Sequence, residues 1–321
     1  YGNTDIQRRV LFAGKQYFAV ADMLSSEEEN LYEWRLHGNG GGTSGGSYRR
    51  QGALARWTRD RGELLAYQAE AAERKFSERD TVHSFAYAQE LTHTFFRVET
   101  SAKTADFLTI LFPRGFNEPE PLLQTLVSSG GQAVEVATEL WRDQVWVRER
   151  LADQISIEVE SGVIVSDARM GFARFVKGRL RALALHDGSY VKLNGEVLVE
   201  ADAEIELSLA IEGRAASGYV RGRDSGYLLS IKLGQTVEQL RHSGIEKKES
   251  LAAAAFELSG AGALDLSLGE DQAQDTAVPI ELGRSPIFAL YPTWPNPFNS
   301  SSNIRYALAQ DGRVSLDTYD L

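Results

Sequence analysis

Apolar residues along most of this chain recur with the two-residue period of a half-buried β-strand, or gather in short runs. No segment shows a long amphipathic repeat of 3.6 residues. Gly, Asp-Gly and Asn-Gly separate the runs, as in antiparallel sheets joined by hairpins. The pattern predicts strands over 10–13, 17–21, 32–36, 63–68, 93–99, 106–112, 133–138, 155–159, 171–176, 179–185, 189–193 and 196–200. We therefore expect an all-β protein with a large antiparallel β-sandwich.

Local signals predict three turns and one helix. Gly14-Lys15-Gln16, Asp187-Gly188 and Asn194-Gly195 each separate two apolar runs, which favours hairpin turns. Residues 69–76 form the best candidate for a short helix.

The domain organisation follows from shifts in this pattern. Residues 1–200 are expected to form one large β unit. Residues 201–268 carry further strand signals and form either a small separate sandwich or the closing strands of the first unit. Residues 269–286 are polar, acidic and flanked by Pro, which is typical of a linker. Residues 287–321 return to a strand pattern and are expected to form a separate segment.

Composition excludes several classes of protein. The chain has 321 residues, no Cys and a net charge of −11. Disulfides and thiolate metal sites are therefore excluded. The acidic excess argues against a nucleic-acid partner, and no apolar run is long enough to span a bilayer.

The C-terminal end carries Pro295-Asn296-Pro297-Phe298-Asn299, Ile304-Arg305-Tyr306, Asp311-Gly312 and Tyr319-Asp320-Leu321. It resembles the start of the Ig-like C-terminal sorting domain that bacteria with a type IX secretion system attach to exported proteins. The resemblance implies a partner in that secretion machinery. It also implies passage through the periplasm to the surface or exterior of a Gram-negative-type bacterium. Such domains continue beyond Tyr-Asp-Leu, and the chain begins at Tyr1 without Met, so we expect a fragment of a larger exported protein.

A second resemblance covers roughly residues 1–200. It rests on Tyr17-Phe18-Ala19-Val20-Ala21-Asp22, Tyr32-Glu33-Trp34-Arg35-Leu36-His37-Gly38-Asn39-Gly40, Thr92-His93-Thr94-Phe95-Phe96-Arg97 and Phe107-Leu108-Thr109-Ile110-Leu111-Phe112-Pro113. These segments resemble the C-terminal β-sandwich, a super-sandwich, of heparinase II/III-like proteins. That family includes lyases that cleave alginate, heparin and related uronate polymers by β-elimination.

The resemblance implies that the main catalytic residues lie outside this chain. In such lyases an α/α toroid precedes the sandwich, and β-elimination needs a base together with neutralisation of the uronate carboxylate. Family members that hold a divalent metal, such as zinc, do so with a His-rich segment and a His-Asn-Thr-like strand. Neither motif occurs here, so we expect no cofactor in this chain and both features upstream of Tyr1.

Two groups of residues are candidates for binding an acidic polysaccharide. His37, with Arg35 and Asn39 beside it, opens the loop Gly38–Gly46, where glycines predominate. We expect this loop to be mobile beside a glycan groove, with capping of a strand end by His37 as the alternative. Arg56 and Arg59 flank Trp57 in a cluster that also contains Arg49, Arg50 and Arg61. Guanidinium groups bind carboxylates, and Trp stacks on sugar rings. The alternative is a solvated strand pair with Trp57 in the core.

The remaining polar candidates favour structural roles. Asp22 is expected to begin a turn, His83 and His93 to be structural rather than to share a metal, and His186 and His242 to be solvated. The sequence thus predicts the sandwich part of an exported polysaccharide lyase, inactive by itself. A non-catalytic glycan-binding or surface-structural β module is the alternative.

Overall fold

The computed structural model describes residues 4–86, 89–233, 237–247, 249–250 and 255–269, together with four short strands beyond residue 288. The chain divides into two compact units, Tyr1–Glu270 and Asp271–Leu321. Every regular element described is a strand, and all pairings are antiparallel, which confirms the predicted all-β sandwich class. The described residues contain no helix long and apolar enough to cross a membrane.

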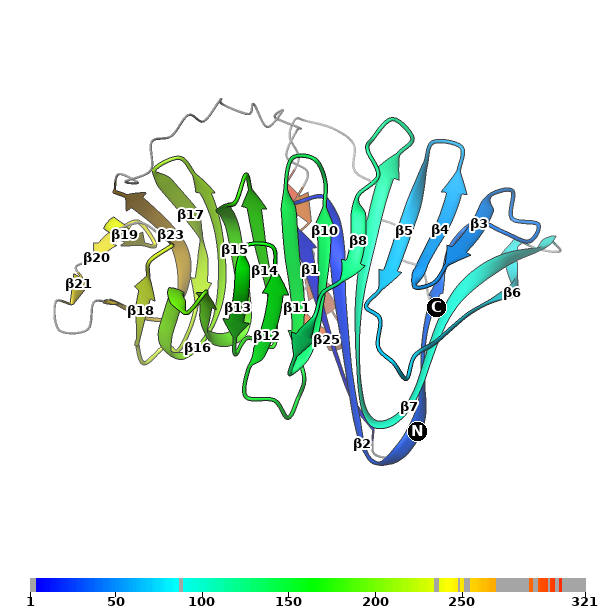
Figure 1. Ribbon diagram of the computed structural model, residues 1–321, viewed down its shortest axis with the longest axis horizontal. Coiled ribbons are helices and arrows are strands. Elements are labelled where there is room, and N and C mark those ends of the chain that lie inside the picture. The colour runs from blue at the N-terminus through cyan, green and yellow to red at the C-terminus, as the bar shows by residue number, and fades with distance from the viewer. Residues whose placement is uncertain are drawn as a thin grey trace. The chain divides into compact units, whose positions relative to one another are not determined.

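The first sheet has seven strands in the order β1-β2-β7-β5-β4-β3, with β6 paired to β7. The strands are β1 (Asp5–Ala13), β2 (Tyr17–His37), β3 (Ser47–Gln51), β4 (Leu54–Arg59), β5 (Gly62–Gln68), β6 (Lys75–Ala86) and β7 (Gln89–Gly115). The long strands β2 and β7 turn together through a sharp bend at the bottom of Figure 1, where their register shifts between Ser25 and Asn30. The bend folds the sheet back on itself around Trp34, Trp57 and Phe96.

The second sheet holds the remaining sixteen strands of the first unit. They are β8 (Leu122–Thr125), β9 (Ser128–Ser129), β10 (Gly131–Ala137), β11 (Arg142–Arg148), β12 (Ile155–Val159), β13 (Gly162–Ser166), β14 (Met170–Val176), β15 (Arg179–Leu193), β16 (Glu196–Glu212), β17 (Ala215–Arg221), β18 (Tyr227–Ile231), β19 (Val237–His242), β20 (Ile245–Lys247), β21 (Glu249–Ser250), β22 (Ala255–Leu258) and β23 (Ala261–Leu268). β16 runs through residue 200 and pairs with β15, β17 and β18. Residues 201–268 therefore provide closing strands of this sheet rather than a separate one.

Strand alternation explains how the sheets stack. Tyr17, Ala19 and Ala21 of β2 point to the same side and pack with the alternating valines of β10 and β11. Trp146 lies between two of these valines on β11, so its side chain points to the opposite face of the strand. There it joins the hydrophobic core within the second sheet. Three hydrophobic clusters thus lie within the first sheet, between the sheets and within the second sheet.

A buried charge lies between the two sheets. The Asp143 carboxylate is fully buried and accepts hydrogen bonds from the Arg174 guanidinium, at 2.7 Å to each oxygen. The Tyr17 hydroxyl donates a third, at 2.8 Å. Arg174 also lies 4.2 Å from the centre of the Trp141 ring. Satisfying this carboxylate requires β2, β11 and β14 together, so it ties the sheets in one arrangement.

The local predictions meet different outcomes. Gly14-Lys15-Gln16 and Asn194-Gly195 do connect neighbouring antiparallel strands. Asp187-Gly188 is not a hairpin, because it lies inside β15 at a register shift against β16. The helix over 69–76 is wrong: the Ala69 and Glu70 amides donate to Leu108 O and Thr125 Oγ1, so they bond to other strands.

The second unit is described only through short strand pairs. β24 (Ala289–Leu290) pairs with β27 (Tyr306–Ala307), and β25 (Trp294–Asn299) pairs with β26 (Ser301–Asn303). Nearly all of the expected linker 269–286, and most of the expected sorting segment 287–321, lie outside the described residues.

Candidate functional site

An open groove of about 550 Å³ lies where β2, β4 and β7 end and β5 begins. It is lined by Gly38, Asn39, Trp57, Arg59, Arg61, Gly62, Glu63, Leu64, Pro113, Arg114, Gly115 and Glu118. Three of the six candidate binding residues, Asn39, Trp57 and Arg59, are therefore brought together here. Arg61, from the β4–β5 turn, belongs to the same predicted arginine cluster, and the structure adds Arg114 from the end of β7.

The Gly-rich loop is pinned against β7. The Thr43 amide donates to Thr92 O at 2.9 Å, and the Thr94 amide donates to Gly40 O at 3.0 Å. A Cβ at Gly41, whose φ is +78°, would lie 2.1 Å from Thr94 Oγ1. Close packing and positive φ explain this glycine, and the hydrogen bonds join the loop to β7 beside the groove.

Arg59 and Arg61 bring charge to the groove without a carboxylate partner. Arg59 Nη1 donates to Asn39 Oδ1 at 2.7 Å and to the Ser44 carbonyl at 2.9 Å, which are both neutral acceptors. Arg61 is exposed and has no ion pair within the described residues. Both guanidinium groups remain available to an anion.

Arg56, in contrast, belongs to a closed ion-pair network. Its Nη1 lies 2.9 Å from Glu63 Oε1, and its Nη2 lies 2.5 Å from Glu120 Oε1. Arg114 bonds the same two carboxylates at 2.9 and 3.1 Å. The hydrogen bond to Glu120 is the main cause that raises the pKa of Arg56. Arg56 therefore links β4 to β5 and to the segment after β7. Its positive charge is neutralised by the carboxylates of Glu63 and Glu120.

Trp57 lies under the groove rather than beside a ligand. Only 3% of the residue is exposed. Its indole N–H donates to the Thr94 carbonyl at 2.9 Å, and its ring packs at Gly38. The alternative that places Trp57 in the core describes this environment, and no sugar-stacking surface remains on its ring.

Arg35 and His37 lie on the outer face of β2, outside the groove lining. Arg35 bonds Glu33, and its Cζ lies 5.7 Å from the Phe95 ring centre. His37 Nδ1 lies 2.9 Å from His93 Nε2. Three of the six candidates therefore lie at the groove and Arg56 lies in the ion-pair network beside it. Arg35 and His37 lie on a different surface, because strand alternation sends them away from the loop that follows them.

The other polar candidates have structural surroundings. Asp22 is buried and bonds Arg8 Nε at 2.5 Å and the Trp34 indole N–H at 3.0 Å, so it does not begin a turn. His242 is 6% exposed, which corrects the solvated assignment, and burial lowers its pKa. The side chain of His83 lies outside the described residues.

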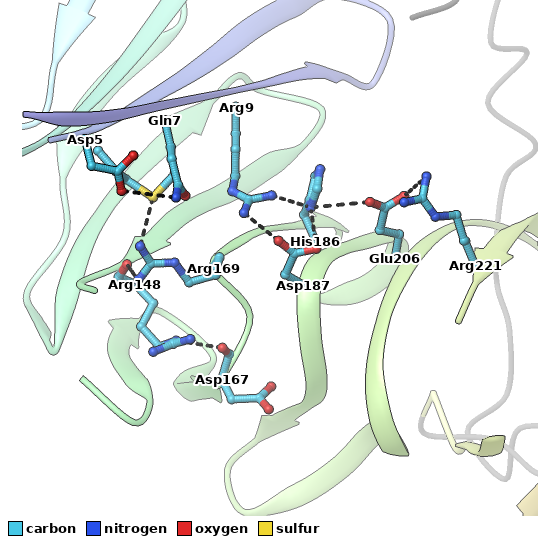
Figure 2. Close-up of polar contacts among 11 residues, drawn as sticks. Asp5, Gln7, Arg9, Arg148, Asp167, Arg169, His186, Asp187, Glu206 and Arg221 are labelled. Carbon is cyan, nitrogen blue, oxygen red and sulfur yellow. Dashed lines mark hydrogen bonds and ion pairs between the residues drawn. The ribbon is translucent and has the colours of Figure 1, made fainter. Parts of the chain in front are cut away.

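A second polar cluster, which the sequence did not reveal, lies where β1 meets β15 and β16. Figure 2 shows Arg9 reaching from β1 toward His186, Asp187 and Glu206. One ligand atom from each of these last three residues lies within 4.8 Å of the others. The irregular register at Asp187, whose φ is +48°, turns consecutive side chains to one side, as β-bulges do. No local sequence pattern announces that bulge.

Arginines already neutralise this cluster. Arg9 Nη2 lies 2.5 Å from Asp187 Oδ2, and Arg221 Nη1 lies 3.6 Å from Glu206 Oε2. The hydrogen bond from His186 and the charge of Arg9 lower the pKa of Asp187 to about 2. The cluster acts as an ionic contact between β1 and the second sheet.

No protein-family model matches this chain, and no curated protein matches its sequence.

Proposed function

We propose that this chain binds an acidic polysaccharide in the groove beside the Gly-rich loop. The observation that carries the proposal is the pair of guanidinium groups at Arg59 and Arg61, which face the groove with no carboxylate partner in the described part of the chain. They do so in a chain whose net charge is −11. An uncompensated positive site on an acidic protein favours an anionic ligand.

The chemistry of the lining favours a uronate polymer. A guanidinium fork binds a carboxylate through two parallel hydrogen bonds, and Arg59 is held in place by Asn39 and Ser44. The groove is open, so a polymer can pass along it. Because the Trp57 ring is covered, we expect affinity to come from charge and hydrogen bonds rather than from stacking.

Binding is better supported than catalysis within this chain. The groove lining contains no His, Tyr or Lys that could take a proton from the substrate. Its two carboxylates are engaged: Glu63 pairs with Arg56 and Arg114, and Glu118 accepts the Gly115 N–H at 2.9 Å. A β-elimination base would therefore come from elsewhere in the parent protein.

The wider proposal is the sandwich part of an exported polysaccharide lyase. It is supported by the resemblance to heparinase II/III-like proteins and by the layered antiparallel sheets that this resemblance implies. Export through type IX secretion rests on the resemblance of the C-terminal end alone. By itself the chain should release no unsaturated uronate product from alginate, heparin or chondroitin, as followed by ultraviolet absorbance.

The direct test compares ligands by calorimetric titration. Alginate oligosaccharides should bind, with an affinity that falls as salt rises, because salt screens exposed charges beyond ~8 Å at physiological ionic strength. Neutral malto-oligosaccharides of equal length should not bind. Equal affinity for both, or affinity independent of salt, would exclude the proposed charge-based recognition.

A further inference from the structure

Two histidines that are far apart in the sequence meet on the outer face of the first sheet. The register of β2 against β7 places His37 opposite Phe95, and His93 lies two residues before Phe95 on the same strand. Since alternate residues of a strand share a face, His93 and Phe95 point to the same side as His37. The two histidines are separated by 56 positions in the chain.

Their rings are held in a defined relation. His37 Nδ1 and His93 Nε2 are 2.9 Å apart, with ring centres 5.2 Å apart. The His37 ring stacks on Phe95 at 4.9 Å and 22°. The backbone on both sides of His93 is bonded to the Gly-rich loop. The Thr92 carbonyl accepts from the Thr43 amide, and the Thr94 amide donates to the Gly40 carbonyl.

We propose that His37 and His93 form a bidentate site for a borderline divalent metal ion, with zinc as the first choice. Zinc–imidazole bonds are about 2.0–2.1 Å long, and two such bonds at the tetrahedral angle place their nitrogens about 3.3 Å apart. The observed separation of 2.9 Å is that of an N–H···N hydrogen bond, and the two nitrogens need to move apart by only about 0.4 Å to hold a bridging metal. Binding replaces the proton between the rings with the ion and needs little movement of the backbone.

The surroundings determine which metals fit. Imidazole nitrogen suits Zn²⁺, Ni²⁺ and Cu²⁺, whereas Ca²⁺ and Mg²⁺ require several oxygen ligands. Arg35 adds positive charge nearby but is bonded to Glu33, and Arg79 lies opposite Phe95 on β6. These positive side chains weaken the electrostatic attraction of the site for any metal cation. We therefore expect the site to prefer metals that bind imidazole nitrogen.

Two protein ligands leave coordination positions for water or a ligand oxygen. The site borders the proposed polysaccharide groove, because the two residues after His37, Gly38 and Asn39, line it. The metal proposal does not depend on that groove binding a glycan.

Calorimetric titration of the full chain with zinc chloride tests the site. We expect one equivalent to bind, with no binding of calcium under the same conditions. His37→Ala and His93→Ala should each weaken zinc binding at least tenfold. His186→Ala is the matched control, because it removes the histidine of the cluster at β15, and it should leave zinc binding unchanged.

Absence of zinc binding to the unaltered chain would overturn the proposal. So would zinc binding that survives both His37→Ala and His93→Ala, or that is lost in His186→Ala, which would assign it to the other cluster. Thermal unfolding provides a second readout that also reports folding of each variant. Zinc should raise the Tm of the unaltered chain and of His186→Ala, but not of His37→Ala or His37→Gln.

Discussion

Arg59 and Arg61 of the groove and the arginines between the two sheets have the same chemistry and opposite surroundings. Among the described residues Arg59 bonds only neutral oxygens, and Arg61 is exposed. Arg174 makes two 2.7 Å bonds to one buried carboxylate, and Arg9 bonds Asp187 (Figure 2). An arginine that already bonds a carboxylate of the protein stabilises the fold, whereas one without such a bond can bind an anionic ligand. The residue type alone does not distinguish the two roles.

The largest effect is expected when the carboxylate partner of a buried arginine is removed, which tests whether that arginine stabilises the fold. Asp143→Ala leaves Arg174 charged between the sheets and the Tyr17 hydroxyl without its acceptor. Breaking a buried pair from one side costs about 3–5 kcal/mol. Urea denaturation should show that loss in the free energy of unfolding. A change below about 1 kcal/mol would mean that Arg174 is solvated and that the sheets do not depend on it.

The packing of the Gly-rich loop against β7 can be tested at Gly41, the loop glycine with the closest such contact. Gly41→Ala introduces a Cβ about 2.1 Å from Thr94 Oγ1 at a φ of +78°. The free energy of unfolding should fall by roughly 1–3 kcal/mol. Gly45→Ala is the matched control: its φ is +81°, but no atom of the described residues lies within 4 Å of the new Cβ. If both variants lose the same stability in urea denaturation, backbone strain alone explains the glycine and the contact with β7 is unimportant.

Asp106 lies between these two cases, because the nearby arginines only partly offset the effect of burial on the pKa of its carboxyl group. Burial raises the pKa of Asp106 from 3.8 to about 6, although Arg169 and Arg74 oppose that shift. The folded state therefore keeps this proton up to a higher pH than the unfolded chain does. This contribution to stability is present below about pH 3.8 and is lost as the pH rises through about 6.

Replacement by an uncharged isostere should remove that pH dependence. Asp106→Asn should flatten the change in unfolding free energy over this pH range and stabilise the chain at neutral pH, by on the order of 1 kcal/mol. Denaturation at several pH values measures it. A steeper pH dependence in the variant would show that the carboxylate is stabilised in the folded state.

The smallest expected effect concerns the residue that positions Arg59. Asn39→Ala removes one of two acceptors of the Arg59 guanidinium and leaves the Ser44 carbonyl. Affinity for alginate oligosaccharides should fall a few-fold, with no change in the free energy of unfolding. In an Arg59→Ala background the same substitution should have no further effect. An additive loss would mean that Asn39 contacts the ligand itself.

Local patterns predicted many of the strands, missed others such as β6, β8 and β11, and predicted the long-range arrangement poorly. The two-residue period and the turns at Gly14 and Asn194 depend on neighbours in sequence, so they could be recognised. Residues 69–76 were assigned to a helix because their bonds to β7 and to Thr125 are not visible locally. The Asp-Gly signal at Asp187 was mistaken for a hairpin because bulges use similar residues.

The candidate site was predicted only in part, for the same reason. The arginines and the Gly-rich loop mark the right region. Which of them carry uncompensated charge depends on Glu63 and Glu120, which join the groove network only through tertiary pairing. The pairing of His37 with His93 depends on the register of β2 and β7.

The most direct test of the difference between the two kinds of arginine is one set of calorimetric titrations with alginate oligosaccharides. The set comprises the unaltered chain, Arg59→Ala with Arg61→Ala, and the matched control Arg179→Ala with Arg181→Ala in the second sheet. Hydrogen bonds to charged groups contribute roughly 1.5–3 kcal/mol each, so the groove pair should lose at least about tenfold in affinity while the control pair loses little. Equal losses from both pairs would reduce Arg59 and Arg61 to ordinary surface charge and contradict a binding site in the groove.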